Sequence, residues 1–221
     1  MSTIDYAKAR NLMVEQQVRP WGVLDQRVLQ VLARVPREAF VSPEHRNLAY
    51  ADLALPLGHG EFMMKPVVEG RALQALELEP SDEVLEIGSG SGYLTACMAQ
   101  LARSVVGLEL HEDLAQQARA RLAGHELHNA SVVHADAFAY TTGRRFDAIC
   151  VGGAVTSIPE RFVEWLKPDG RIFIVRGRSP AMDAVLVKPG QDGAPAGQVT
   201  SLFETDLPYL VGGAPVPAFS F

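Results

Sequence analysis

The chain has 221 residues, of which 48% are hydrophobic and 21% are charged. This balance is typical of a folded globular protein and excludes wholesale disorder. With 20 Lys and Arg against 26 Asp and Glu, the formal net charge is −6. A mildly acidic chain has no general attraction to nucleic acid or to an anionic membrane. We therefore expect neither as a partner.

The two cysteines, Cys97 and Cys150, are too few for a disulfide framework and cannot form a zinc site alone. We expect a reducing compartment, no bound metal, and both thiols in the core. Residues 1–15 carry charges throughout and lack the apolar run of a secretion signal. No stretch approaches the about 20 apolar residues of a membrane span. The sequence thus predicts a cytoplasmic protein and indicates no particular oligomeric state.

The first third of the chain is predicted to be helical and then irregular. Asp25 is a candidate N-cap for a helix whose apolar face runs from Val28 to Val35 and which ends at Pro36. The glycine-containing stretch 55–60 predicts a loop. After Lys65 and Pro66 an apolar helical pattern resumes through Leu76.

From about residue 83, short apolar runs alternate with amphipathic segments. The predicted strands are 84–87, 105–108, 131–134, 146–151 and 171–175. The first predicted helix is 94–101, and the second has Leu114, Ala118 and Leu122 on one face. The third starts at Pro159, carries Phe162, Trp165 and Leu166, and ends at residues 168–170. Repeated βα alternation predicts a mostly parallel sheet with helices on both faces.

The tail departs from this alternation. Segments 184–187 and 199–203 are predicted strands, separated by a Gly- and Pro-rich loop at 189–197 rather than by a helix. Strands joined in this way are expected to pair antiparallel at the sheet edge. We therefore expect one α/β domain at 81–221, preceded by a helical extension with a substrate loop at 1–80.

The segment from Glu86 to Tyr93 is the most informative in the chain. It follows a predicted strand and opens a predicted helix, the context in which a glycine loop binds an anionic or nucleoside ligand. Its glycines lie at 88, 90 and 92. A dinucleotide fingerprint, G-x-G-x-x-G, requires glycine at Tyr93 instead. The spacing therefore disfavours a nicotinamide cofactor.

Three acidic residues stand at or just after successive predicted strands. Glu86 lies in an apolar run, where an unpaired carboxylate is costly. Glu109 ends the next strand, where a carboxylate can accept hydrogen bonds from ribose hydroxyls. Asp136 follows the third strand, within reach of a base edge. Each has an alternative reading as a helix cap or a turn residue. Together they favour a nucleoside with positive charge, such as S-adenosylmethionine.

At this point the sequence resembles the protein-L-isoaspartate O-methyltransferase family, within the class I S-adenosylmethionine-dependent methyltransferases. The resemblance runs from about Met13 to Val175. Its segments, in family order, are Val35-Pro36-Arg37-Glu38-Ala39-Phe40-Val41, Ala54-Leu55-Pro56-Leu57-Gly58-His59-Gly60, Val84-Leu85-Glu86-Ile87-Gly88-Ser89-Gly90-Ser91-Gly92-Tyr93, and Phe146-Asp147-Ala148-Ile149 with Ile158-Pro159. A Rossmann-like class I methyltransferase fold is therefore expected.

The resemblance also implies roles for particular residues. The loop from Glu86 to Gly92 is expected to hold the methionine part of S-adenosylmethionine, Glu109 the ribose, and Asp136 the adenine side. The residues assigned to cofactor binding are Glu86, Ile87, Gly88, Ser89, Gly90, Gly92, Glu109, Leu110, Asp136 and Ala137.

The chain departs from the family in its substrate motif. The family typically reads Gln-Thr-Ile-Ser-Gln-Pro, with the serine hydroxyl at the reaction centre, whereas residues 61–66 here read Glu-Phe-Met-Met-Lys-Pro. Met64 stands at the serine position and Phe62 at the threonine position, so two hydroxyls are replaced by apolar groups. The tail after Val175 also matches poorly.

The candidate catalytic residues are Lys65, His59 and Met64. Lys65 either orients an acceptor carboxylate or is a solvated lysine, and His59 is either a base for a hydroxyl or amine acceptor or a loop histidine. Residues 62–64 either line an apolar pocket or pack beneath the loop.

Isoaspartyl methylation in damaged proteins ranks first, with a protein or peptide as substrate. The alternatives are a methyltransferase of the same fold acting on another acceptor, such as a small molecule, and a cofactor-binding protein without catalysis.

Overall fold

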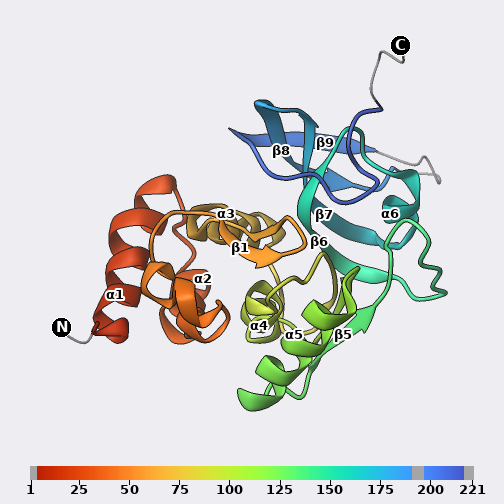
Figure 1. Ribbon diagram of the computed structural model, residues 1–221. Coiled ribbons are helices and arrows are strands. Elements are labelled where there is room, and N and C mark those ends of the chain that lie inside the picture. Colours follow the sequence, from red (N-terminus) through yellow and green to blue (C-terminus); the bar gives the residue numbers. More distant parts are fainter. Residues whose placement is uncertain (1–3, 191–196, 217–221) are drawn as a thin grey trace, which may run out of the picture.

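A computed structural model describes residues 4–190 and 197–216 (Figure 1). A seven-stranded sheet forms the larger part, and the N-terminal helices pack beside it. Within the described residues, no helix has the length and apolar character needed to cross a membrane.

The N-terminal part consists of short helical segments. Helix α1 (Tyr6–Met13) continues through a π-helical turn at Val14–Val18 and a 3₁₀ turn at Arg19–Trp21, and α2 spans Gln26–Arg34. The predicted cap is confirmed, because the Asp25 carboxylate accepts a hydrogen bond from the Arg27 amide at 2.7 Å. Further 3₁₀ turns follow at Arg37–Ala39 and Pro43–Leu48.

The sheet has the strand order β5-β4-β3-β6-β7-β8-β9. The strands are β3 (Glu83–Ile87), β4 (Ser104–Glu109), β5 (Ala130–His134), β6 (Phe146–Val155), β7 (Leu166–Arg178), β8 (Ala181–Lys188) and β9 (Gln198–Thr205). Strands β3 to β7 pair in parallel, whereas β8 and β9 pair antiparallel at one edge. The predicted α/β architecture is confirmed, with two antiparallel strands at the edge.

Alternate strand residues feed two hydrophobic cores, one on each side of the sheet. Val84 and Cys150 belong to the core shared with α3 (Pro66–Leu76), α4 (Tyr93–Ala99), α5 (Glu112–Gly124) and the N-terminal helices. Leu85 and Val151 belong to the core shared with α6 (Glu160–Glu164). Cys97 joins the first core, so both cysteines are free and buried as predicted.

Two sequence predictions need correction. Residues 55–60, expected to be a loop, form most of a hairpin in which β1 (Leu55–Gly58) pairs antiparallel with β2 (Glu61–Met63). The glycines mark its turn, where His59 and Gly60 take left-handed conformations (φ 55° and 80°). In addition, β7 begins at Leu166, before the 168–170 segment that was expected to end a helix. Pairing of Leu166 with Phe146 extends the strand, and an irregularity in register absorbs the following Pro and Gly.

Candidate cofactor and acceptor site

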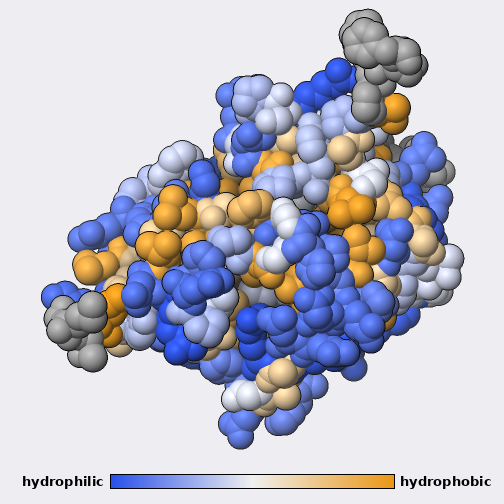
Figure 2. All heavy atoms as spheres, in the orientation of Figure 1, coloured by the Kyte–Doolittle hydropathy of each residue, from blue (hydrophilic) through white to orange (hydrophobic). Residues whose placement is uncertain are grey.

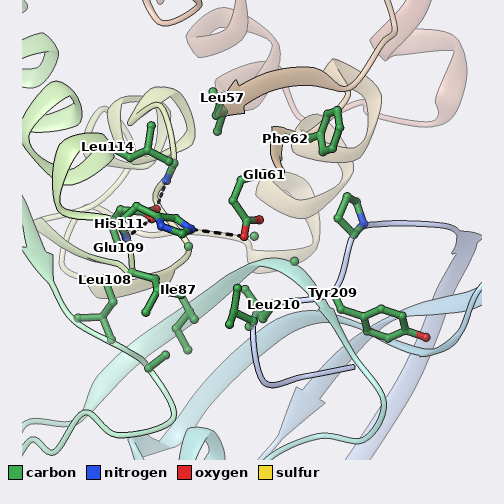
Figure 3. A pocket seen from close by; sticks show the side chains of 18 of the residues that line it. Leu57, Glu61, Phe62, Ile87, Leu108, Glu109, His111, Leu114, Tyr209 and Leu210 are labelled. Carbon is green, nitrogen blue, oxygen red and sulfur yellow. Dashed lines mark hydrogen bonds and ion pairs between the residues drawn. The ribbon is translucent and has the colours of Figure 1, made fainter. Parts of the chain in front are cut away.

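A cleft lies beyond the carboxyl ends of β3, β4, β5 and β6, where open α/β sheets bind ligands. The space it encloses, including its open mouth, is about 810 Å³. The β1–β2 hairpin covers one side, and the segment 207–211, which follows β9, closes another (Figure 3). Figure 2 shows apolar residues gathered in the middle of this face, flanked by hydrophilic ones.

Two glycines of the loop after β3, Gly88 and Gly90, line the cleft with main-chain atoms. Gly88, Gly90 and Gly92 all have positive φ (81°, 50° and 82°), which favours glycine at each position. A Cβ on Gly92 would also lie 3.1 Å from Ala118 Cβ, and one on Gly152 would lie 2.6 Å from the Gly88 carbonyl oxygen. Strand, loop and helix N-terminus therefore approach more closely than side chains would allow, and a ligand meets the main chain directly.

Glu109 is fixed at the end of β4 with its carboxylate at the cleft. It is buried, and it accepts hydrogen bonds from the Gly90 amide at 2.7 Å and the His111 amide at 2.9 Å. Asp136 lies across the cleft after β5, where it accepts from the Phe138 amide at 2.8 Å. Leu110 and Ala137 line the cleft beside them. The structure thus brings two of the three carboxylates that the sequence singled out, Glu109 and Asp136, to one cleft.

Glu86 lies beneath the glycine loop rather than in the main cleft. Together with Ser89 it lines a smaller hollow that shares Gly88 and Gly90 with the cleft, whereas Ile87 lines the cleft itself. The Glu86 carboxylate is buried and accepts a hydrogen bond from the Thr95 hydroxyl. Burial raises the pKa of Glu86 to about 8, against the opposing effect of Thr95. A cationic ligand above it would favour its ionised form.

Met64 is buried at the junction of the two hollows and lines both. Its carbonyl oxygen accepts a hydrogen bond from the buried guanidinium of Arg37, which also pairs with Glu69 of α3. Burial raises the pKa of Glu69 to about 7, although Arg37 acts in the opposite direction. This internal ion pair holds the end of the hairpin against α3.

Lys65 and His59 lie outside the cleft lining. Lys65 is exposed at the N-cap of α3. His59 is exposed at the hairpin turn, where its Nε2 lies 2.9 Å from an oxygen of Asp113, and its ring stacks on His111 with centroids 4.1 Å apart. The hydrogen bond from His59 lowers the pKa of Asp113. Of the three candidate catalytic residues, the structure places only Met64 in the cleft.

Several lining residues were not found from the sequence. Glu61, Leu57 and His111 reach the cleft from the hairpin and from the turn before α5, while Gly152 and Gly153 lie within β6. Leu207 to Val211 also contribute, because the Leu210 amide donates to Ala154 at 2.9 Å and fixes this segment beside β6. Two consecutive glycines within a strand, Gly152 and Gly153, are a local sequence signal that another backbone approaches closely.

A parallel sheet with a bare glycine loop and a carboxylate at the end of the adjacent strand defines a Rossmann-like α/β protein with a nucleoside-type site. The fit to S-adenosylmethionine, which the resemblance implies, rests on the Gly88–Gly92 cradle and on the fixed Glu109 carboxylate.

Comparison with known proteins gives the family. The chain matches the profile of the protein-L-isoaspartate(D-aspartate) O-methyltransferase (PCMT) family over residues 8–199. It is 36% identical over 189 residues to a protein-L-isoaspartate O-methyltransferase of Herpetosiphon aurantiacus, covering 85% of this chain and 84% of that protein. It is 41% identical over 174 residues to the enzyme of Methylorubrum extorquens, covering 78% and 76%. The chain therefore belongs to the protein-L-isoaspartate O-methyltransferase family.

A solved structure supports the fold. A Plasmodium falciparum protein described as a protein-L-isoaspartate O-methyltransferase, in complex with S-adenosyl-L-homocysteine, superposes with a TM-score of 0.78. The match covers 91% of this chain and 97% of that one at 22% identity. The Rossmann-like fold expected from the sequence is thus confirmed.

Proposed function

We propose that this protein transfers the methyl group of S-adenosylmethionine to the α-carboxylate of L-isoaspartyl residues in damaged proteins. The observation that carries the proposal is the family match, which spans residues 8–199 and includes the intact glycine loop. Within this proposal, residues 81–221 hold the cofactor and residues 1–80 provide the hairpin at the acceptor side. Glu109 holds the ribose, Asp136 and Ala137 the adenine side, and Gly88 to Gly92 the methionine part.

The chemistry makes small demands on the protein. S-adenosylmethionine, when bound, supplies a methyl group on a positively charged sulfur. A carboxylic acid with a pKa of about 4 is already ionised at neutral pH, so the acceptor needs no general base. The hairpin and the segment 207–211 act by aligning the acceptor and excluding water. An apolar Met64 is compatible with these tasks.

One observation favours a second candidate, a methyltransferase that acts on a less polar acceptor. Phe62 and Met64 replace the two hydroxyls of the family motif, and both side chains line the cleft. An acceptor with an apolar body would pack against these side chains, whereas a carboxylate gains no hydrogen bond from them.

A peptide assay tests the proposal. The readout is formation of S-adenosylhomocysteine with an isoaspartyl peptide, and the matched aspartyl peptide serves as the control. Turnover with the isoaspartyl peptide alone supports the proposal. Binding of S-adenosylmethionine without turnover on either peptide contradicts it, and turnover on a less polar acceptor would then support the second candidate. Absence of turnover with every acceptor class tried would instead favour a cofactor-binding protein without catalysis.

A further inference from the structure

The lining of the cleft has few side chains that bind an anion. Among the described residues, its lining includes three carboxylates (Glu61, Glu109 and Asp136) and one imidazole (His111), but no Lys, Arg, Ser or Thr. The one hydroxyl in the lining belongs to Tyr209. It donates to the Gly177 carbonyl oxygen at 3.0 Å and accepts from the Ser179 amide at 3.2 Å, and Figure 3 shows it directed away from the cleft.

Two of the three carboxylates are engaged by the main chain. Glu109 accepts from two backbone amides and Asp136 from one. The Glu61 carboxylate accepts no hydrogen bond from any residue in the described ranges 4–190 and 197–216. The imidazole of His111 lies beside it, with Nε2 3.6 Å from Glu61 Oε1. Glu61 projects from β2 into the cleft between His111 and Leu210 (Figure 3).

This arrangement bears on an acceptor that is itself negatively charged. An isoaspartyl α-carboxylate entering beside Glu61 places like charges close together, which opposes binding unless a cation accompanies it. Among the residues that the structure describes, the lining provides no permanently charged cation. A basic side chain on the substrate can supply the missing charge, and its methylene stem can pack on exposed Phe62 and Val211 at the mouth of the cleft.

We propose that Glu61 is a specificity-determining residue that binds a Lys or Arg side chain next to the isoaspartyl residue, so that the protein prefers basic damaged segments to acidic ones. This inference rests on the proposed function. It assigns Glu61 a role in substrate binding and none in the methyl-transfer step.

Isoaspartyl peptides that differ at one flanking position provide the test. One set carries Lys, Ala or Glu immediately before the isoaspartyl residue, and a second set carries them immediately after it. We expect kcat/KM to be about tenfold higher for Lys than for Glu on at least one side, mainly through KM. In Glu61→Gln the ratio should fall to about twofold, and in Glu61→Lys the order should reverse. The control is Glu164→Gln, an exposed change on α6, which should leave the ratio unchanged.

The outcomes separate this inference from the proposed function. Binding of S-adenosylhomocysteine and the melting temperature are measured for each variant, so that a folding defect is recognised. Methyl transfer that is equal across the wild-type peptide series, or a Lys preference that survives in folded Glu61→Gln, would overturn the role of Glu61 alone. Absence of transfer to every isoaspartyl peptide by wild-type protein that binds the cofactor would overturn the proposed function and, with it, this inference.

Discussion

Leu57 of the hairpin lies directly over Gly90 of the glycine loop. Its Cδ1 is 2.7 Å from the position that a Cβ on Gly90 would occupy. The hairpin, which comes from the N-terminal part, therefore packs against the loop that is proposed to hold the cofactor. Two features favour glycine at position 90, namely this contact and the positive φ.

Substitution Gly90→Ala should therefore weaken cofactor binding. The added methyl group collides with Leu57 and strains the backbone, so we expect the Kd for S-adenosylhomocysteine to rise by about tenfold or more. Isothermal titration calorimetry measures this change. Gly124→Ala is the matched control, because no atom lies within 4 Å of its added Cβ and its φ is not positive. Equal affinity in wild type and Gly90→Ala would contradict the placement of the cofactor on this loop.

Glu109→Gln should also weaken binding, for a different reason. The neutral amide is a poorer acceptor for the Gly90 and His111 amides, and it is a poorer acceptor for ribose hydroxyls. Hydrogen bonds to a charged group contribute about 1.5–3 kcal/mol, so we expect a roughly tenfold to hundredfold rise in Kd. Exposed Glu112 is adjacent on α5, and Glu112→Gln should leave the affinity unchanged. If the two variants bind alike, Glu109 does not hold the ribose.

The buried Glu86 predicts how stability depends on pH. Its pKa is about 8 in the folded protein, against an ordinary value of 4.5. Between these values the folded protein keeps a proton that the unfolded chain releases. Glu86 therefore makes the free energy of unfolding fall as the pH rises through this window, by at most about 1.4 kcal/mol per pH unit.

Urea unfolding of the cofactor-free protein tests this prediction. The free energy of unfolding of wild type relative to Glu86→Gln should decline from pH 5 to about pH 8. Glu69, with a pKa of about 7, is present in both proteins, and its charge contributes to the raised pKa of Glu86. A difference that does not change with pH would show that Glu86 is already ionised in the folded protein.

Met64→Ser restores the hydroxyl of the family motif and tests what that group contributes. Because the acceptor carboxylate is already a nucleophile, the hydroxyl acts by orientation. We therefore expect kcat/KM for an isoaspartyl peptide to rise by no more than about tenfold, the equivalent of one hydrogen bond. Met64→Leu separates packing from hydroxyl effects and should leave kcat/KM near the wild-type value. Activity confined to Met64→Ser would show that the native acceptor is not isoaspartyl.

The elements proposed to hold the cofactor were predictable because their determinants are local. A strand, a glycine loop and a helix follow one another between Glu83 and Ala99, and their periodicity and spacing identify them. Glu109 was found for the same reason, since the end of a parallel strand is a recognisable ligand position. Here local pattern and tertiary structure agree.

The acceptor side was less predictable because it is assembled from distant segments. Tyr209 forms a β-bridge with Ala154. Leu210 packs against Gly153, and a Cβ added to Gly153 would lie 2.9 Å from Leu210 Cδ2. No local pattern links residues that far apart. The β1–β2 hairpin was missed because both strands are short. In addition, β1 contains Pro56, which weakens the pattern expected of a strand.

The proposed function requires that the methyl group reach an isoaspartyl carboxylate. The most direct measurement is to incubate the protein with labelled S-adenosylmethionine and an isoaspartyl peptide, and then to map the label by fragmentation in the mass spectrometer. We expect one methyl group on the α-carboxylate of the isoaspartyl residue and none on the matched aspartyl peptide. A label on any other group, or on both peptides equally, would contradict it.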